Sequence, residues 1–245
     1  MRPGSSGVFA GSLVAALAGC RAKVDTKGFE DLIRTRTTAM GLHATKVACP
    51  ADVEAKPGKV FTCQVEVDGK KTYALDVTVT SVDKASSKAN FDTGWHDGAA
   101  AVVATLDSSL SAELGKSLGG AVVVRCGDEP LRFLDAQRKI RCQLVAGDVT
   151  TSATIDFDAA LNATDWHLDP PLLAKAKLEN LLLPAVREKT APGVEIDCGP
   201  AAFLLRPADG MLHCTAVDGE HRAKLEVEVD DKLAVKRWEI PAQPQ

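Results

Sequence analysis

Six of the seven cysteines fall into three couples, and this spacing restricts the possible folds more than any other feature of the chain. The couples are Cys49 and Cys63, Cys126 and Cys142, and Cys198 and Cys214. Their internal spacings are similar (63 − 49, 142 − 126 and 214 − 198), and the second couple recurs in the third with a period of 72 (198 − 126 and 214 − 142). The three tryptophans, Trp95, Trp166 and Trp238, recur with almost the same period (166 − 95 and 238 − 166). Two independent rare residue types with one period indicate a tandem repeat.

The residues around each couple predict the same succession of strands. A short apolar strand leads into the first cysteine, and a strand of alternating pattern contains the second. A turn of Asp and Gly follows, and both residues tolerate the positive φ that hairpin turns need. In the strand after the turn every second residue is apolar, as in Leu75, Val77 and Val79. This alternation predicts an antiparallel sheet with one buried and one solvated face.

A helical stretch is predicted before each first cysteine. In the second repeat every third or fourth residue is apolar, and these residues form one stripe along the helix: Val103, Leu106, Leu110, Leu114 and Leu118. In the first repeat the stripe consists of Phe29, Leu32, Ile33 and Met40, and Gly41 marks the end. We expect each helix to cover one face of its sheet.

The third helix is expected to begin at Pro170-Pro171, since proline suits the first helical position. Its apolar residues would be Leu178, Leu181 and Leu182. Pro184 should kink or end it, because proline has no N–H and clashes with the carbonyl one turn back.

These elements predict an α+β chain of three small repeats at residues 27–97, 98–169 and 170–240, followed by a flexible tail at 241–245. Each repeat would hold one helix on an antiparallel sheet of about four strands. A domain this small buries a limited core and commonly needs a covalent staple. A disulfide that closes a loop of about 15 residues contributes on the order of 3 kcal/mol.

We expect each cysteine couple to form a disulfide inside its own repeat. Metal binding is the first alternative, but the couples lack the close Cys-x-x-Cys pairs typical of structural zinc, and no histidine lies at matching offsets. Thiol redox chemistry also usually relies on Cys-x-x-Cys. Pairing between repeats is the remaining connectivity. The sequence therefore predicts no metal site and no cofactor.

Residues 1–19 have the features of an export leader. Arg2 supplies a positive charge, and the apolar run from Val8 to Ala16 is shorter than the roughly 20 residues that span a bilayer. The run ends in Leu17-Ala18-Gly19-Cys20, which resembles a bacterial lipobox. That resemblance implies that the Cys20 thiol receives a diacylglyceryl group, that the leader is cut before Cys20, and that residues 20–26 become a lipidated tether. The alternative is a conventional signal peptide that leaves Cys20 free or buried.

The first repeat resembles a known family of exported bacterial proteins. The residues that carry the resemblance are Val47-Ala48-Cys49-Pro50, Gly58, Phe61-Thr62-Cys63-Gln64-Val65, Asp68-Gly69 and Val77-Thr78-Val79. They are similar to the bacterial domain-of-unknown-function family 4333, over about residues 25–83. The other repeats diverge from this pattern: Gly follows Cys126 and Cys198 in place of Pro, and residues 135–138 lack the expected turn glycine. The resemblance implies a helix, a small sheet and a disulfide, and it brings no catalytic residue.

Two further surfaces are possible sites. Trp95-His96 and Trp166-His167 place a histidine beside a tryptophan near the end of two repeats. The functional interpretation is a metal or ligand contact made twice; the alternative, which we favour, is a core tryptophan with a solvated neighbour. The loop Pro200–Leu205 is apolar, and it fits packing on the neighbouring repeat better than a partner site.

No catalytic signature such as Gly-x-Ser-x-Gly or His-Glu-x-x-His is present. The net charge of −4 with interspersed charges gives no basic footprint for nucleic acid. We therefore expect a non-enzymatic binding or structural module, lipid-anchored to the membrane on the extracytoplasmic side of the cell envelope. Its partner would be an envelope protein or a cell-wall polymer. The alternatives are a protein inhibitor or regulator of an envelope enzyme, and an unrecognised hydrolase.

Overall fold

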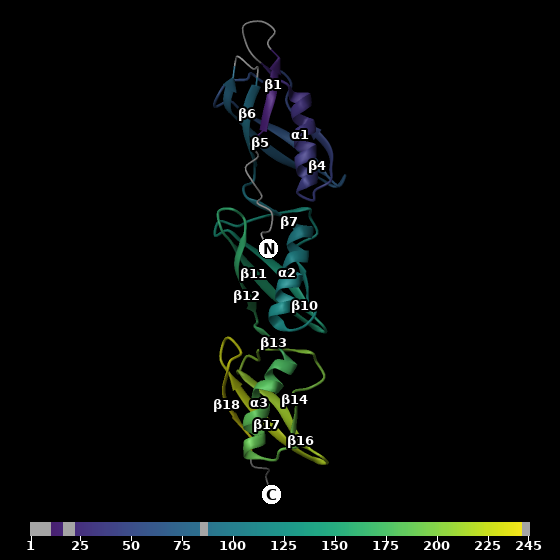
Figure 1. Ribbon diagram of the computed structural model, residues 1–245, viewed down its shortest axis with the longest axis vertical. Helices are drawn as coiled ribbons and strands as arrows, with labels where there is room; N and C mark the ends of the chain where they lie inside the picture. Colours follow the sequence, from purple (N-terminus) through teal and green to yellow (C-terminus); the bar gives the residue numbers. More distant parts are fainter. Residues whose placement is uncertain (1–10, 17–22, 84–87, 242–245) are drawn as a thin grey trace. The chain divides into compact units, whose positions relative to one another are not determined.

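The computed structural model describes residues 11–16, 23–83 and 88–241, the first of these segments by its backbone alone (Figure 1). This part of the chain is mixed α+β, with three helices and several antiparallel sheets. It divides into two compact units: the described residues up to 106, with 126–140 and 156–165, form the first, and residues 107–125, 141–155 and 166–241 form the second. The prediction of an α+β chain is confirmed at this level.

The first unit is built on a six-stranded sheet. The strands are β1 (Gly11–Ala16), β2 (Lys23–Val24), β3 (Ala44–Ala48), β4 (Val60–Val67), β5 (Lys71–Asp83) and β6 (Lys88–Trp95). Their spatial order is β2-β1-β6-β5-β4-β3, and neighbouring strands pair antiparallel. In β4 and β5 every second side chain is buried, which is the alternation predicted from the sequence.

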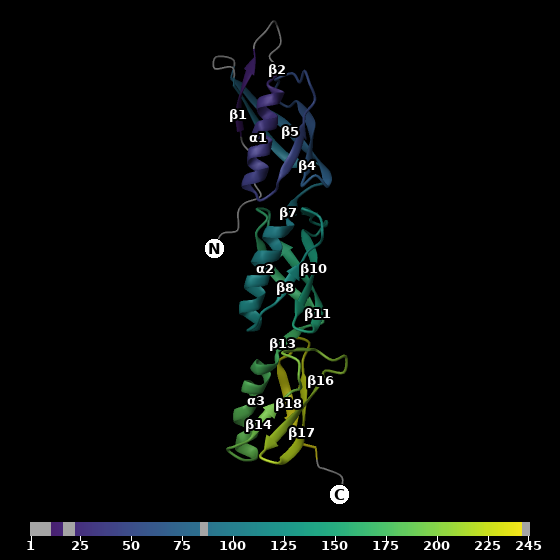
Figure 2. The same cartoon turned by 90° about the vertical axis from the view of Figure 1, so that its right-hand side faces the viewer.

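Helix α1 (Thr26–Ala39) covers one face of this sheet (Figure 2). It begins where it does because the Asp25 carboxylate accepts a hydrogen bond from the backbone N–H of Gly28 at 3.1 Å. It is followed by Gly41, whose φ of +86° suits glycine. Phe29 lies at the centre of the contact, with ring centroids 5.9 Å from Phe61 and 4.8 Å from Phe91.

The core of the first unit extends into a second, two-stranded sheet that the sequence did not predict. Strands β7 (Ala100–Val102) and β9 (Leu131–Phe133) pair antiparallel. Ala100, Val102 and Leu131 are buried in the same apolar cluster as α1 and the six-stranded sheet. The Phe133 ring lies 6.2 Å from that of Tyr73, and Lys71 forms a 2.5 Å ion pair with Glu129.

The next elements along the chain are α2 (Val103–Leu118), β8 (Val123–Arg125), β10 (Lys139–Ala146), β11 (Val149–Phe157) and β12 (Ala163–Asp169). The strands form a sheet of order β12-β11-β10-β8. Every residue of the apolar stripe predicted for this helix is buried, which confirms the stripe. Cys126 and Cys142 are both disulfide-bonded.

Arg138 occupies the turn position where the sequence lacks the expected glycine. Its φ is +60°, a value uncommon for a residue with a Cβ. The Asp135 carboxylate accepts hydrogen bonds from the backbone N–H groups of Gln137 (3.0 Å) and Lys139 (2.8 Å), one on each side of Arg138. The guanidinium donates to the carbonyl of Asp158. These contacts hold the turn in the left-handed conformation without glycine.

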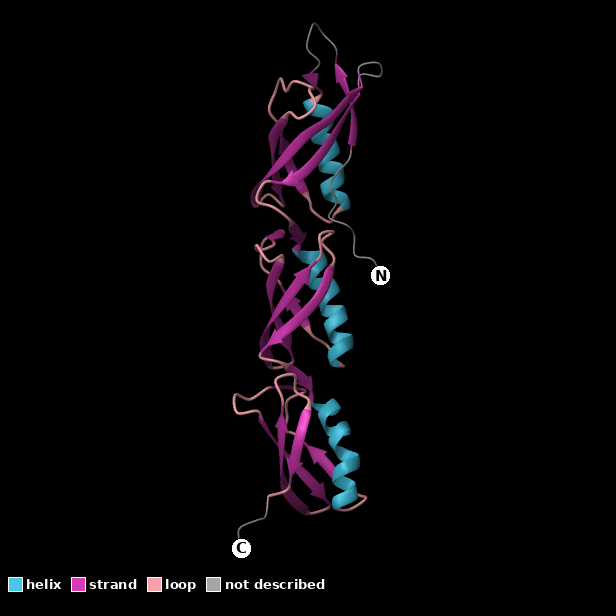
Figure 3. Ribbon diagram, turned by 90° about the vertical axis from the view of Figure 1, so that its left-hand side faces the viewer, coloured by secondary structure: helices cyan, strands magenta, loops and turns pink. Residues whose placement is uncertain are grey.

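The second unit contains α3 (Lys175–Lys189) and the four-stranded sheet β14-β16-β17-β18. The strand bounds are β14 Glu195–Asp197, β16 Met211–Asp218, β17 His221–Val229 and β18 Val235–Glu239. Figure 3 shows α3 on one face of this sheet. Leu178, Leu182 and Val186 are buried in one cluster with Leu225 and Val227.

The predicted start of the third helix and the predicted place of Leu181 in its apolar stripe were wrong. The helix begins at Lys175, because Leu172–Ala174 forms strand β13 and leaves the two prolines before it. Pro184 was expected to kink or end the helix, and it does not end it, because the helix continues to Lys189. Leu181 is 62% exposed, since the buried stripe runs at every fourth position and passes it by.

Strand β13 pairs antiparallel with β15 (Phe203–Leu205), so part of the predicted apolar loop is a strand. Phe203 is buried, and its ring lies against Gly120. An ideal Cβ built on Gly120 would stand 2.6 Å from Cζ of that ring. The apolar segment therefore packs on a part of the chain far earlier in the sequence, in agreement with the packing interpretation.

Replacing Gly120 by alanine is expected to destabilise the second unit by about 1–3 kcal/mol, because a buried ring must move. Thermal unfolding of Gly120→Ala should show this loss, whereas Gly94→Ala, where an added Cβ meets nothing within 4 Å, serves as the control. Adding Phe203→Leu should restore part of the loss. A Gly120→Ala protein as stable as the control would contradict the contact.

The amino-terminal segment is more structured than the sequence indicated. Gly11–Ala16, expected to be leader alone, forms β1. The segment 20–26, expected to be a tether, contains β2 and the first residue of α1. Val24 is buried, and its N–H donates to the carbonyl of Val53 at 2.8 Å, so the fold reaches nearly to Cys20.

Two of the predicted features lie outside the described residues: Cys20 itself, and residues 242–245 of the expected tail. Among the described helices, none is long and apolar enough to cross a membrane.

Candidate functional site

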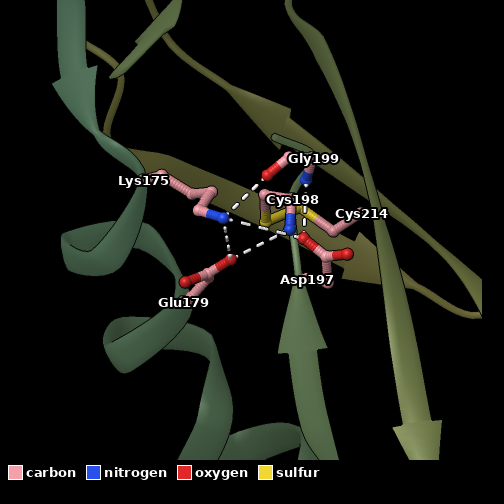
Figure 4. The surroundings of a disulfide bond; sticks show 6 residues. All are labelled: Lys175, Glu179, Asp197, Cys198, Gly199 and Cys214. Carbon is pink, nitrogen blue, oxygen red and sulfur yellow. Dashed lines mark hydrogen bonds and ion pairs between the residues drawn. A yellow bond between two sulfur atoms is a disulfide. The ribbon is translucent and has the colours of Figure 1, made fainter. Parts of the chain in front are cut away.

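A polar cluster surrounds the disulfide between Cys198 and Cys214, where α3 meets β14 (Figure 4). The two cysteines are 7% and 5% exposed. One carboxylate oxygen of Glu179, on α3, accepts a hydrogen bond from the backbone N–H of Cys198 at 2.9 Å. A helix side chain thus holds the backbone of the residue that carries the disulfide. A charged acceptor makes this bond stronger than a neutral one.

Lys175 completes the cluster one turn earlier on the same helix. Its Nζ donates to the carbonyl of Gly199 at 2.7 Å and lies 3.8 Å from Glu179 and 3.7 Å from Asp197. The carboxylate of Asp197 in turn accepts from the N–H of Gly199 at 2.9 Å. The ammonium therefore joins the helix to both sides of Cys198, as Figure 4 shows.

A matching bond occurs at the first disulfide, Cys49–Cys63. A carboxylate oxygen of Glu30, on α1, accepts from the N–H of Cys49 at 2.8 Å. Glu30 precedes Cys49 by 19 residues, and Glu179 precedes Cys198 by the same 19. We call this arrangement of helix carboxylate, cysteine N–H and cystine the cystine clasp. Asp107, on α2, has the same spacing from Cys126 (126 − 107).

The cystine clasp fastens a helix to its sheet. The disulfide joins the segment after the helix to the next strand of the sheet, and the carboxylate ties the helix to the same residue. Glu30, Glu179 and Lys175 were missed in the sequence, where the available signal was the constant spacing from an acidic residue to the first cysteine. Each of these charged side chains has a hydrogen-bond partner within the fold, so a structural role is sufficient to explain its presence.

His96 lies just after β6, beside Asp76 on the exposed face of the first sheet. Its Nδ1 is 2.8 Å from one carboxylate oxygen of Asp76, and the Thr62 hydroxyl donates to the other at 2.7 Å. The hydrogen bond and charge of Asp76 raise the pKa of His96 above its ordinary value. The Thr62 hydroxyl, then His96, lower the pKa of Asp76. Because the carboxylate stands between the other two groups, the imidazole is not placed to take a proton from Thr62.

A titration of the His96 ring protons by NMR should give a pKa above 6.5, and Asp76→Asn should lower it toward that value. Asp97→Asn is the control, because Asp97 contributes less to the shift. The sign follows from linkage: this ion pair stabilises the fold below the pKa of the unfolded histidine and weakens as the pH rises through the folded value. An unchanged His96 pKa in Asp76→Asn would contradict the contact.

The other predicted site residues are not brought together. His167 lies on β12, apart from the contact of His96 with Asp76. Within the described residues, no group of three His, Cys, Asp or Glu side chains could hold a metal ion. An apolar hollow of about 10 Å³ lies between α1 and the sheet, lined by Phe29, Leu75 and Phe91 among others. It is the size of about one water, far below the roughly 300 Å³ of a small-molecule site.

Comparison with known proteins finds one family. Residues 8–84 match the family model described as Domain of unknown function (DUF4333), which confirms the resemblance predicted from the first repeat. The match runs from the segment of β1 through β5. No curated protein and no solved structure matches the chain.

Proposed function

We propose that the chain is an exported lipoprotein of three tandem α+β repeats, held to an envelope membrane through Cys20, and that it works as a non-catalytic binding module. The observation that carries the proposal is the disulfide bonding of all three cysteine couples. Disulfides persist in extracytoplasmic, oxidising compartments, and small exported domains depend on them. A chain whose three cysteine couples are all disulfide-bonded suits that environment.

The element bounds support the tandem organisation. Each element from β7 through β12 begins 72 positions before a counterpart between β13 and β18; examples are α2 and α3 (175 − 103) and β10 and β16 (211 − 139). The recurrence includes the two-stranded sheets, since β9 and β15 begin at the same interval (203 − 131). Repeats of this kind present extended surfaces suited to proteins or polymers.

The position of Cys20 supports the anchor. Lys23 pairs with Asp52 at 2.5 Å and Val24 is buried, so the part of the fold that follows the proposed cleavage begins three residues after Cys20. Three residues span at most about 11 Å. An acylated Cys20 would therefore hold the first repeat close to the membrane surface, where a membrane-bound partner is within reach.

Mass spectrometry of the protein isolated from cell envelopes tests the anchor. We expect a mature chain that begins at Cys20 and carries acyl chains, and we expect Cys20→Ala to keep its leader and to lack them. Proximity labelling from the native chain, with Cys20→Ala as the control, should then mark envelope neighbours. An unmodified amino terminus at another residue would refute the anchor.

A further inference from the structure

Strand β1 pairs with the outer edge of β6, whereas the corresponding strands of the two four-stranded sheets, β12 and β18, are edge strands. It pairs antiparallel with β6, with Gly11 opposite Phe91 and Val14 opposite Lys88, while β5 pairs with the other edge of β6. Strands β12 and β18 follow β11 and β17 as β6 follows β5, and both are terminal strands of their sheets. The pairing of β1 is therefore an addition to the first sheet.

The proposed processing site falls between β1 and β2. Residues 11–16 precede Cys20, whereas Lys23 and Val24 follow it. Residues 23 and 24 have contacts of their own with the segment 52–54: the N–H of Val24 donates to the carbonyl of Val53, and Lys23 forms a bridge with Glu54. Removal of the leader thus takes away β1 and leaves β2 attached to the fold.

The loss of β1 would leave β6 with one unpaired edge. At Lys88–Phe91 the backbone N–H and C=O groups that point away from β5 would lose their partners. Such an edge is a template for another strand. Its side chains are already placed, since Ala89 and Phe91 are each 1% exposed and face the core. A strand that binds here needs no rearrangement of the sheet.

We infer that, in the processed protein, the outer edge of β6 binds an extended segment of another polypeptide by strand addition, antiparallel to β6, in the place of β1. The inference rests on the proposed removal of the leader. Strand addition draws its affinity from main-chain hydrogen bonds and its specificity from alternate side chains.

The chemistry of the partner segment follows from the strand that it replaces. The sequence that pairs with this edge in the uncut chain, Gly11-Ser12-Leu13-Val14, is uncharged and small to apolar, so the partner segment has the same chemistry. With Cys20 acylated and Lys23 only three residues later, the first repeat would lie near the membrane, and the partner segment would accordingly be a membrane-proximal one.

The test uses a fluorescein-labelled peptide of residues 8–17 as the probe and fluorescence polarisation as the measurement. The processed chain, purified from envelopes in detergent and checked for folding by circular dichroism, should bind the peptide with saturation. The uncut Cys20→Ala chain should bind at least about tenfold more weakly, because its own β1 competes at a high effective concentration.

Two modified peptides distinguish a strand ladder from general hydrophobic binding. In a strand, successive N–H groups point to opposite sides, so N-methylation of Leu13 or of Val14 should abolish binding in one peptide and preserve it in the other. Hydrogen exchange of residues 88–91 should slow when the unmodified peptide binds, while that of β17 stays constant.

Equal binding by the processed and uncut chains, equal binding of the two N-methylated peptides, or a processed protein that dimerises through β6 and excludes the peptide would each overturn the inference. Mass spectrometry of the amino terminus distinguishes a failure of the strand-addition inference from a failure of the proposed function. An acylated Cys20 together with no peptide binding refutes strand addition alone. A leader that stays uncut in the cell refutes the anchor, and the inference that rests on it, whatever the peptide does.

Discussion

Replacing Phe29 by alanine is expected to lower the unfolding free energy of the first unit by about 3–5 kcal/mol, the range for loss of a buried aromatic side chain. Phe29 is 1% exposed, and its ring contacts those of Phe61 and Phe91. Removal of the ring leaves a void next to an existing hollow and weakens the contact of α1 with the sheet. Because the net stability of a domain is only about 5–15 kcal/mol, this loss brings the unit near unfolding.

Hydrogen exchange read peptide by peptide is the suitable measurement, because a chain of several units need not unfold in one step. Amides of β4 and β5 should exchange roughly a hundredfold or more faster in Phe29→Ala, since about 1.4 kcal/mol corresponds to a factor of ten. Leu181→Ala is the control: Leu181 is also an apolar residue on a helix, but it is 62% exposed, and its loss should change stability by no more than about 0.5 kcal/mol. Similar losses in the two variants would show that the described packing of Phe29 is wrong.

Replacing Cys198 and Cys214 together by alanine is expected to cost the second unit about 3 kcal/mol, as for a loop of this length. The sequence separation of the two cysteines is 16. Alanine keeps the backbone N–H of residue 198, so Glu179 can still accept its hydrogen bond and the change isolates the covalent link. Glu179→Ala, in the presence of the disulfide, then measures the other half of the cystine clasp, for which about 1–3 kcal/mol is expected.

The matched control is the double replacement of Cys49 and Cys63. Exchange should accelerate in β14 and β16 for the first double variant, and in β3 and β4 for the second, because each disulfide joins residues of its own segment. Acceleration of both regions by either variant would contradict local fastening. Retained protection in all four strands would show that the disulfides add little to the fold.

Much of the fold could be predicted from spacing along the chain. The couples Cys49–Cys63 and Cys198–Cys214 are bonded as expected, and the stripe from Val103 to Leu118 is buried in full. Alternation in β5 and β17 also matches the burial of their side chains. These features succeed because disulfides of short loops, helical stripes and strand alternation are local properties with a fixed period.

The predictions failed where a contact with a residue distant in the sequence overrides the local preference of the chain. Proline preference suggested a helix start at Pro170, but pairing of Leu172–Ala174 with β15 makes those residues a strand. The period of 72 would have located the start correctly, since α2 begins at Val103 and α3 at Lys175. Arg138 adopts the conformation expected of glycine because Asp135 and Asp158 hold it there.

The candidate site was also predicted in part from the sequence and revealed in part only by the tertiary structure. The sulfur pairs were visible in the sequence, whereas the roles of Glu30 and Glu179 became recognisable only when α1 and α3 were placed against Cys49 and Cys198. The strand character of Gly11–Ala16 depends on an edge of β6 that lies far along the chain. The amino-acid sequence is sufficient to predict interactions that recur with a fixed period within a few helical turns or neighbouring strands. Main-chain pairing at a sheet edge carries no side-chain signature, so this edge, with the partner strand inferred for it, emerges from the folded chain alone.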